Sequence, residues 1–463
     1  MTASYTVEHV LLDPAAAERL AGFEVELPAA GEQGHLHVLR IRGWVGRALG
    51  PSAVEILYHG RPIQIAPVRG TRPESPAARS DLDGTETASW EALVGLVGLR
   101  EDAELELRVV LDGDVRVPAG TLKLRRERLR SGFEAQVQPL LLSSLGRSGS
   151  TWLMKVFAAH PEIVTLRRFP YESSAGKYWM HAMKVLSDPA NLELSAHPDS
   201  FHSDRWWAGS NPYFDAVAID DPERAAWLGR EHIERLARFF QETVEDWYLA
   251  VARSQEQEAP RYFAEKHLWP NFLPMLVREL YPGAREVFLV RDFRDVACSA
   301  LAADARRGYS GFGREPHMSE AQYVRDVVRR MATDMQRSWE ARGPGAHLVR
   351  YEDMARQPQE TLRSLLTFLG VDAGGGTVDR LLALASEVLP DLPGSTAEPG
   401  YAERDRGDRS PEQSIGRWRE QDEGFREVLD EALGEALSAF GYEREGGASG
   451  RAAGRSAAQP AVD

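Results

Sequence analysis

The stretch that decides the fold is QPLLLSSLGRSGSTWLMKVFAAHP, residues 138–161. An apolar run typical of a buried strand leads into a Gly/Ser loop and then into a segment with helical spacing. Gly146 and Gly149 permit a tight turn because glycine has no Cβ. The amides of residues 148–151 then begin a helix, where they and the helix dipole can hold a phosphate. Side chains that could add donors are those of Arg147, Ser150 and Thr151.

This loop differs from the loop of nucleotide triphosphatases. That loop reads G-x-x-x-x-G-K-[ST], with a lysine on the terminal phosphates and a hydroxyl on the metal. Here Gly146 and Gly149 stand too close together, and no lysine precedes Ser150. A P-loop kinase or nucleotide hydrolase is therefore kept only as an alternative.

A second strand and helix are expected in GAREVFLVRDFRDVACSAL, residues 283–301. The apolar run ends at Arg291, and Ser299 follows eight residues later on the first turns of the helix. The two side chains could grip one phosphate from two sides. A surface network of the neighbouring arginine and aspartate side chains is the alternative.

Two further segments complete the pattern. HLVRYEDMARQPQETLRSLLTFLGV, residues 347–371, repeats the strand-turn-helix form, and DRSPEQSIGRWREQ, residues 408–421, adds a glycine with flanking basic residues. Together the four segments resemble the sulfotransferases that use 3'-phosphoadenosine-5'-phosphosulfate (PAPS), over roughly residues 137–442. The resemblance implies a P-loop NTPase-like α/β fold, a parallel sheet flanked by helices.

The resemblance also implies a donor site without a metal. The family loop [KR]-S-G-[ST]-T-W is matched by residues 147–152, so Arg147 would lie on the sulfonate and its bridging oxygen, with Trp152 near the adenine. Arg291 and Ser299 match the 3'-phosphate site. The C-terminal pattern R-K-G-x-x-G-x-W is matched only in part, because its arginine falls on Pro411. The implied donor-binding residues are Arg147, Ser148, Gly149, Ser150, Thr151, Trp152, Arg291, Ser299, Tyr351, Ser414, Gly416 and Arg417.

The acceptor's proton needs a base, and RYFAEKHLWPNFLP, residues 261–274, offers two. If the strand continues, Glu265 and His267 point the same way and Lys266 points oppositely. One branch of the resembled family has a histidine base in K-x-H-L-P, and another has an acidic residue before lysine. We favour His267 as the base, since histidine titrates near neutral pH, with Glu265 as the alternative and Lys266 as a contact for the sulfonate.

The acceptor site is expected in the aromatic-rich stretch after the first helix. Aromatic faces pack against sugar rings and apolar groups, so this stretch could form a wall or lid. Core packing is the better explanation for Tyr178 and Met183, which have helical spacing. The candidate acceptor-binding residues are Phe169, Tyr171, Trp206 and Trp207.

The N-terminal part of the chain follows a different pattern. Residues 23–128 alternate short apolar runs with Gly, Pro and Asp, which indicates a small all-β sandwich, with Asp112-Gly113 as a hairpin turn. It resembles accessory β-domains of bacterial glycan-modifying transferases, which would imply glycan binding, with a structural spacer as the alternative. The expected organisation is an arm at 1–22, this sandwich, a sulfotransferase domain at 137–442 and a disordered tail at 445–463.

Composition limits the partners and the location. The 463 residues carry a net charge of -15, so nonspecific binding to nucleic acid is not expected and any anion site must be local. Cys298 is the single cysteine, and His181, His197 and His202 have no metal-ligand spacing. Without a long apolar run or signal peptide, we expect a cytoplasmic protein. A homodimer stays open.

The sequence therefore predicts a bacterial sulfotransferase that moves a sulfonate group from PAPS to a hydroxyl of a glycan, glycosylated or small-molecule acceptor. Besides the kinase alternative, a non-catalytic protein that binds nucleotides and glycans stays open.

Overall fold

The computed structural model describes residues 3–69, 86–168, 171–187, 189, 221–267, 273–342, 345–386 and 410–444. The chain forms two compact units. Unit 1 comprises Met1–Glu134, Lys177–Thr243 and Met275–Pro282. Unit 2 comprises Ala135–Gly176, Val244–Pro274 and Gly283–Asp463. The expected tail at 445–463 lies outside the described residues.

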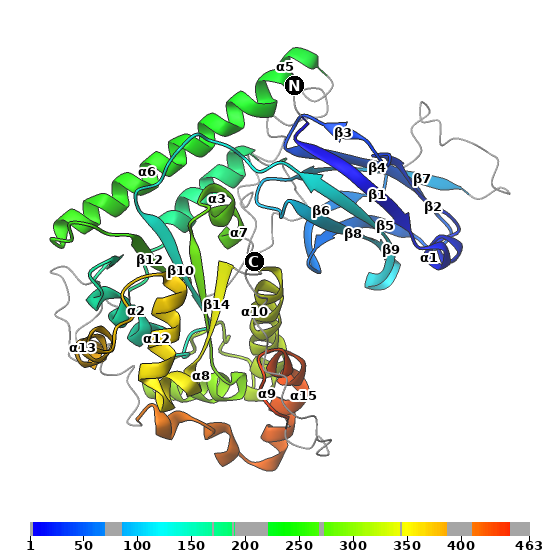
Figure 1. The fold of residues 1–463 in the computed structure, drawn as a ribbon. Helices are drawn as coiled ribbons and strands as arrows, with labels where there is room; N and C mark the ends of the chain where they lie inside the picture. The colour runs from blue at the N-terminus through cyan, green and yellow to red at the C-terminus, as the bar shows by residue number, and fades with distance from the viewer. Residues whose placement is uncertain are drawn as a thin grey trace. The chain divides into compact units, whose positions relative to one another are not determined.

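Unit 1 contains two antiparallel sheets, which form the β-sandwich that the sequence predicts (Figure 1). One sheet has the order β3-β1-β9-β8-β5-β6 and the other β2-β4-β7. Inward-facing residues alternate with exposed ones along β8, as a half-buried strand requires. The strands are β1 (Tyr5–Leu12), β2 (Phe23–Leu27), β3 (Gln33–Gly34), β4 (Val38–Gly46), β5 (Pro51–Tyr58), β6 (Arg61–Pro67), β7 (Thr87–Gly95), β8 (Asp102–Leu111) and β9 (Val115–Arg126).

Two local predictions about this part can be compared with the structure. The turn predicted at Asp112-Gly113 connects β8 to β9, and Gly113 takes the positive φ of 75° that glycine tolerates. The stretch 1–22, expected as an arm, contains β1 and the short helix α1 (Pro14–Arg19). Because β1 pairs with β9 through backbone hydrogen bonds, the sheet begins before residue 23.

Unit 2 is built on a parallel five-stranded sheet in the order β11-β12-β10-β13-β14. Its neighbours pair in parallel, so the carboxyl ends of the strands meet at one edge. The strands are β10 (Gln138–Ser144), β11 (Ile163–Thr165), β12 (Tyr262–His267), β13 (Arg285–Val290) and β14 (Ala346–Arg350). The α/β fold that the sequence predicts is confirmed.

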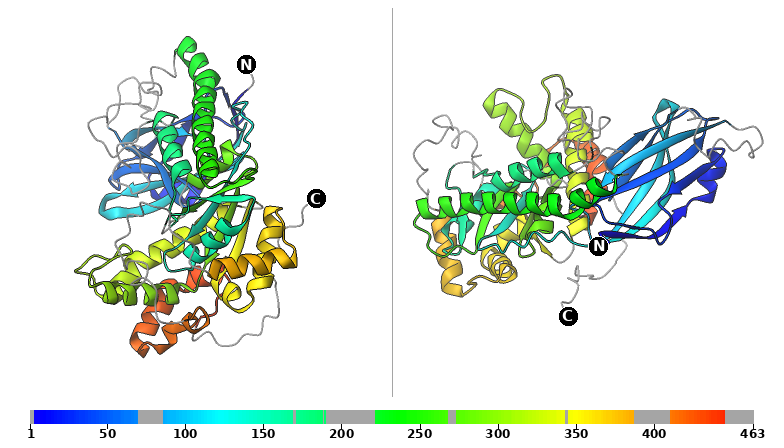
Figure 2. Two further views of the ribbon diagram at one scale, coloured as in Figure 1. Left: turned by 90° about the vertical axis from the view of Figure 1, so that its left-hand side faces the viewer. Right: turned by 90° about the horizontal axis from the view of Figure 1, so that it is seen from above.

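Helices cover both faces of this sheet, with α12 and α13 on one face and α10 on the other (Figures 1 and 2). The alternation along β13 explains this arrangement. Val287 and Leu289 pack with α2, α12 and α13, whereas Phe288 and Val290 pack with α8, α10 and α15. The helices of unit 2 are α2 (Ser150–Ala159), α8 (Phe293–Arg307), α9 (Glu320–Gln322), α10 (Arg329–Arg342), α11 (Tyr351–Arg356), α12 (Pro358–Leu369), α13 (Gly375–Ser386) and α15 (Glu423–Ala439).

Three helices pass from one unit to the other along the chain: α3 (Ala175–Ser187), α6 (Ile233–Ser254) and α7 (Leu273–Leu280). The short helix α5 (Pro222–Ala226) precedes α6 and is capped by the side chain of Asp221.

Strand β10 lies between β12 and β13, so the chain leaves it toward opposite sides of the sheet. In open α/β sheets, ligands bind at the carboxyl ends of the strands where the order reverses in this way. The loop after β10 and the residues that follow β12, β13 and β14 are therefore the place to look for a site.

Candidate functional site

The loop between β10 and α2 has the conformation of an anion-binding turn. Arg147 and Gly149 have positive φ angles of 70° and 85°, and Gly149 caps α2 without a side-chain hydrogen bond. A Cβ at Gly149 would lie 2.9 Å from Cδ2 of Tyr351, and one at Gly146 would lie 3.0 Å from Cδ1 of Phe312. Close packing therefore disfavours a side chain at both positions, and the positive φ adds to this at Gly149.

The structure brings the two predicted phosphate-binding segments together. Arg147 Nε donates to Ser299 Oγ at 3.3 Å, and Arg291 Nη1 donates to the carbonyl of Arg147 at 3.0 Å. These contacts join the loop after β10 to the end of β13 and the start of α8. Phe312 lies under the Arg147 guanidinium, 5.8 Å from it.

Arg291 also reaches the fourth predicted segment. Its Nη2 donates to the carbonyl of Ser414 at 2.5 Å, and its guanidinium lies 4.6 Å from the ring centroid of Tyr351. Tyr351 in turn donates to the carbonyl of Pro411 at 3.2 Å, and burial raises the pKa of its phenol, which keeps this donor protonated. The buried Nε of Arg291 has no hydrogen-bond partner within the described residues. Since a buried donor normally has a partner, this nitrogen is available to a bound ligand.

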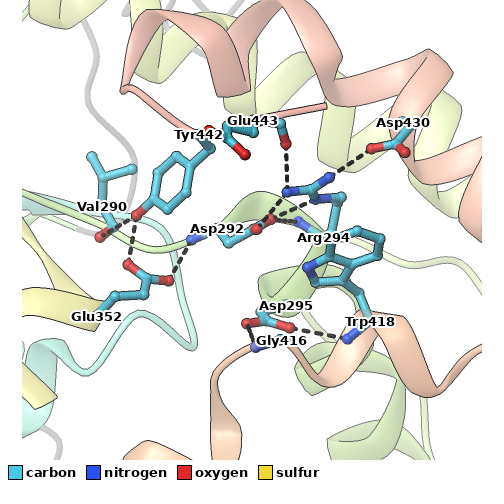
Figure 3. A network of polar contacts seen from close by, with 10 residues as sticks. All are labelled: Val290, Asp292, Arg294, Asp295, Glu352, Gly416, Trp418, Asp430, Tyr442 and Glu443. Carbon is cyan, nitrogen blue, oxygen red and sulfur yellow. Dashed lines mark hydrogen bonds and ion pairs between the residues drawn. The ribbon is translucent and has the colours of Figure 1, made fainter. Parts of the chain in front are cut away.

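The other charged residues at the start of α8 form a buried network (Figure 3). Arg294 pairs with Asp292 at 2.8 Å and with Asp430 at 2.7 Å. Asp295, which is fully buried, accepts hydrogen bonds from the amides of Gly416 at 2.7 Å and Trp418 at 3.1 Å. The Arg-Asp network named as the alternative is thus present between Arg294 and Asp292, but it is buried rather than at the surface, and it also contacts the C-terminal segment.

Burial raises the pKa of the Asp295 carboxyl from its ordinary 3.8 to about 6, and the Arg291 guanidinium limits that rise. The carboxyl is therefore mostly ionised at neutral pH.

At the end of β12, Lys266 lies on the face of the sheet that α2 covers. Its Nζ donates to Thr151 Oγ1 at 3.4 Å and pairs with Glu172 at 2.9 Å. The lysine is buried, whereas the Glu172 side chain is 36% exposed. The positively charged side chain of Lys266 therefore lies beside the first turn of α2, which follows the loop.

Glu265 and His267 lie on the opposite face of β12 from Lys266, as predicted. Both are buried, and His267 Nε2 lies 3.7 Å from Glu265 Oε2. Glu265 is committed to the backbone, because its two oxygens accept from the Gly176 amide at 3.0 and 3.1 Å. His267 Nε2 has no hydrogen-bond partner within the described residues. The imidazole is the less engaged of the two predicted bases.

The remaining predicted residues vary in position. Ser148 in the loop and Ser150 at the start of α2 are buried, and Trp152, also on α2, is half-buried against the core. Tyr171, predicted to contact the acceptor, is 2% exposed within that same core. Three predicted residues lie outside the described residues, namely Phe169, Trp206 and Trp207.

Sequence reasoning missed three residues that the structure brings to this edge: Glu172, Asp295 and Phe312. Asp295 carried a signal, because it stands one helical turn before Ser299. Glu172 and Phe312 had no such signal, because they lie in segments whose sequence shows no recognisable pattern.

Two searches of the described residues gave no result. They contain no cluster of three or more His, Cys, Asp or Glu side chains that could hold a metal ion. Among their helices, none has the length and apolar character that crossing a membrane requires.

Comparison with known proteins identifies the family. A model described as "Sulfotransferase family" matches residues 139–374, which is about half of the chain and includes the loop and the ends of β12, β13 and β14. The chain belongs to this sulfotransferase family. A search of curated proteins found no match.

Three solved structures to which the chain is similar are described as sulfotransferases. The sulfotransferase domain from the curacin biosynthetic pathway is 16% identical, with 67% of this chain and 100% of that one covered and a TM-score of 0.41. The domain from the Synechococcus PCC 7002 olefin synthase is 17% identical, with coverage of 68% and 99% and a TM-score of 0.37. The mouse sulfotransferase SULT7A1 complexed with PAP is 15% identical, with coverage of 66% and 87% and a TM-score of 0.35.

Proposed function

We propose that this protein transfers a sulfonate group from PAPS to a hydroxyl of a glycan, glycosylated or small-molecule acceptor. The observation that carries the proposal is the convergence of Arg147, Arg291 and Ser299, which come from two strand ends 144 residues apart along the chain. A donor with phosphates at both ends of its ribose needs two anion sites, and these residues bring donor groups from both strand ends together. The net charge of -15 makes such a local cationic cluster more significant.

The residues present suit this donor. The loop amides and Arg147 would hold the 5'-phosphosulfate, and Arg291 with Ser299 would hold the 3'-phosphate. The buried Nε of Arg291, which has no hydrogen-bond partner within the described residues, is available to an anionic ligand at this position. PAP, the adenosine 3',5'-bisphosphate product, would occupy the same residues.

The donor supplies an activated sulfonate, whose bond from sulfur to the phosphate oxygen breaks as the acceptor oxygen bonds to sulfur. The chain's residues then have two tasks. Arg147 and Lys266 neutralise charge that develops on the departing phosphate, which is worth most when the donors are fixed in advance. A base takes the acceptor's proton, and we assign this to His267, whose Nε2 has no hydrogen-bond partner within the described residues and lies 3.7 Å from Glu265 Oε2.

We further propose an aromatic acceptor wall and a glycan-binding role for the β-sandwich, on the basis of composition, and a cytoplasmic location in a bacterium, on the basis of the sequence. The two other functions considered make different predictions. A kinase or nucleotide hydrolase would consume ATP with magnesium, and a binding protein would hold PAP or glycans without transfer.

The test is transfer of radiolabelled sulfate from PAPS across a panel of glycans, glycosylated small molecules and phenols, with and without a metal chelator. We expect transfer that survives chelation, with ATP inactive as a donor. Arg147→Ala should reduce turnover at least about 100-fold, since it removes a preorganised donor at the developing charge. Arg306→Ala, on the exposed side of α8, is the matched control. ATP turnover, or PAP binding with no transfer to any acceptor, would refute the proposal.

A further inference from the structure

The segment from Pro411 to Trp418 is held by three residues of unit 2 that come from separate elements. Tyr351 at the start of α11 donates to the Pro411 carbonyl, and Arg291 after β13 donates to the Ser414 carbonyl. Asp295 on α8 accepts from the amides of Gly416 and Trp418, one with each carboxylate oxygen. Of these three side chains, only that of Asp295 is fully buried.

Helix α8 connects this segment to the phosphate loop. Asp295 and Ser299 are four residues apart and so lie on the same face of the helix. Ser299 receives the hydrogen bond from Arg147, and Asp295 fixes Gly416, two residues beyond the carbonyl that Arg291 contacts. One helix face therefore links the two halves of the donor site.

From these contacts we infer that Asp295 is a positioning residue that sets the preference for a nucleotide phosphorylated on its ribose 3'-oxygen. Asp295 does not touch the ligand. It holds residues 414–418 so that Ser414 orients the Arg291 guanidinium, whose Nε remains available for the phosphate. The inference rests on the proposed function, because it assigns the 3'-phosphate to Arg291.

The substitution Asp295→Asn tests this with little change in side-chain volume. An amide keeps one oxygen acceptor but presents an NH₂ donor to the second backbone N–H, so one of the two hydrogen bonds is lost. The matched control is Asp430→Asn. Asp430 belongs to the same buried network through Arg294 but does not contact residues 411–418.

The experiment measures binding of PAP and of AMP, which lacks the 3'-phosphate, by calorimetry to the full chain and both variants. We expect Asp295→Asn to weaken PAP binding about 10- to 100-fold while AMP changes less than about threefold. In turnover, KM for PAPS should rise more than kcat falls. Asp430→Asn should bind both nucleotides like the wild type.

The outcomes separate the inference from the proposed function. If the wild type does not prefer PAP over AMP, the proposed donor site is wrong. If the wild type has the preference and Asp295→Asn keeps it, or loses affinity for both nucleotides equally, the positioning role is wrong. Should Asp295→Asn fail to fold, Gly416→Ala applies the same test from the other side, because φ at Gly416 is 75° and a Cβ there would strain the segment.

Discussion

Two regions at the carboxyl edge of the parallel sheet differ in the contacts that their polar side chains make. After β10 and β13, arginine side chains contact carbonyls and hydroxyls from distant segments, and one buried guanidinium nitrogen is left without a partner within the described residues. At the end of β12, by contrast, acidic and basic side chains pair with one another or with the backbone. The difference is the one that the proposed function requires, with an anion site in the first region and a base beside it in the second.

The largest effect is expected at the end of β12. His267→Ala should reduce kcat about 100- to 10,000-fold, the usual contribution of a general base. PAP affinity should stay within about twofold, because His267 lies on the face of β12 opposite Lys266 and Thr151. Pre-steady-state turnover and calorimetry measure the two quantities.

Two companion variants sharpen this prediction. If His267→Ala keeps near-normal turnover while Glu265→Gln loses it, the carboxylate is the base and the order is reversed. Glu172→Gln is the control for a carboxylate near the loop that pairs with Lys266. If Glu172→Gln loses the most turnover of the three variants, the base lies on the other face of β12, and the contrast between the two regions is wrong.

A smaller effect is expected from Arg291→Lys, which keeps the charge but not the fork that spans two carbonyls. The guanidinium contacts Arg147, Ser414 and Tyr351, and a lysine ammonium cannot make all of these contacts together. PAP affinity should fall about 10- to 100-fold and AMP affinity less than about threefold, measured by calorimetry. Arg306→Lys, at an exposed position near the end of α8, should change neither. A loss shared equally by PAP and AMP would count against a 3'-phosphate site at Arg291.

The contrast also explains what could be predicted from the sequence. Strand β10 spans Gln138–Ser144, and its apolar run and the following glycines mark it in the sequence. Strand β12 extends through His267, a continuation that the sequence pattern left open. Its last three residues are charged or polar and buried, which sequence patterns read as a loop.

Contacts between segments that are distant in the sequence could not be predicted from local patterns. Arg291 and Ser299 were identified by their spacing on one strand and helix. That Arg291 contacts Ser414, and that Asp295 binds the Gly416 amide, depends on how segments more than 120 residues apart pack. Such packing is set by the whole core and leaves no local signature.

The smallest effect is expected from two glycine variants, which separate the cost of a positive φ from the effect of close packing on PAP binding. Gly149→Ala and Gly308→Ala both place a Cβ at positive φ, 85° and 77°, and each should lower the free energy of unfolding by about 1–2 kcal/mol. At Gly308, which ends α8, no atom lies within 4 Å of the added Cβ, whereas at Gly149 Cδ2 of Tyr351 lies at 2.9 Å. Gly149→Ala should therefore displace the ring beneath Arg291 and weaken PAP binding about tenfold more than Gly308→Ala does, a difference of about 1.4 kcal/mol. Denaturant melts and calorimetry on the two variants give both numbers. Equal PAP affinities would mean that the close contact with Tyr351 serves only the fold, and that the donor region is less preorganised than its hydrogen bonds indicate.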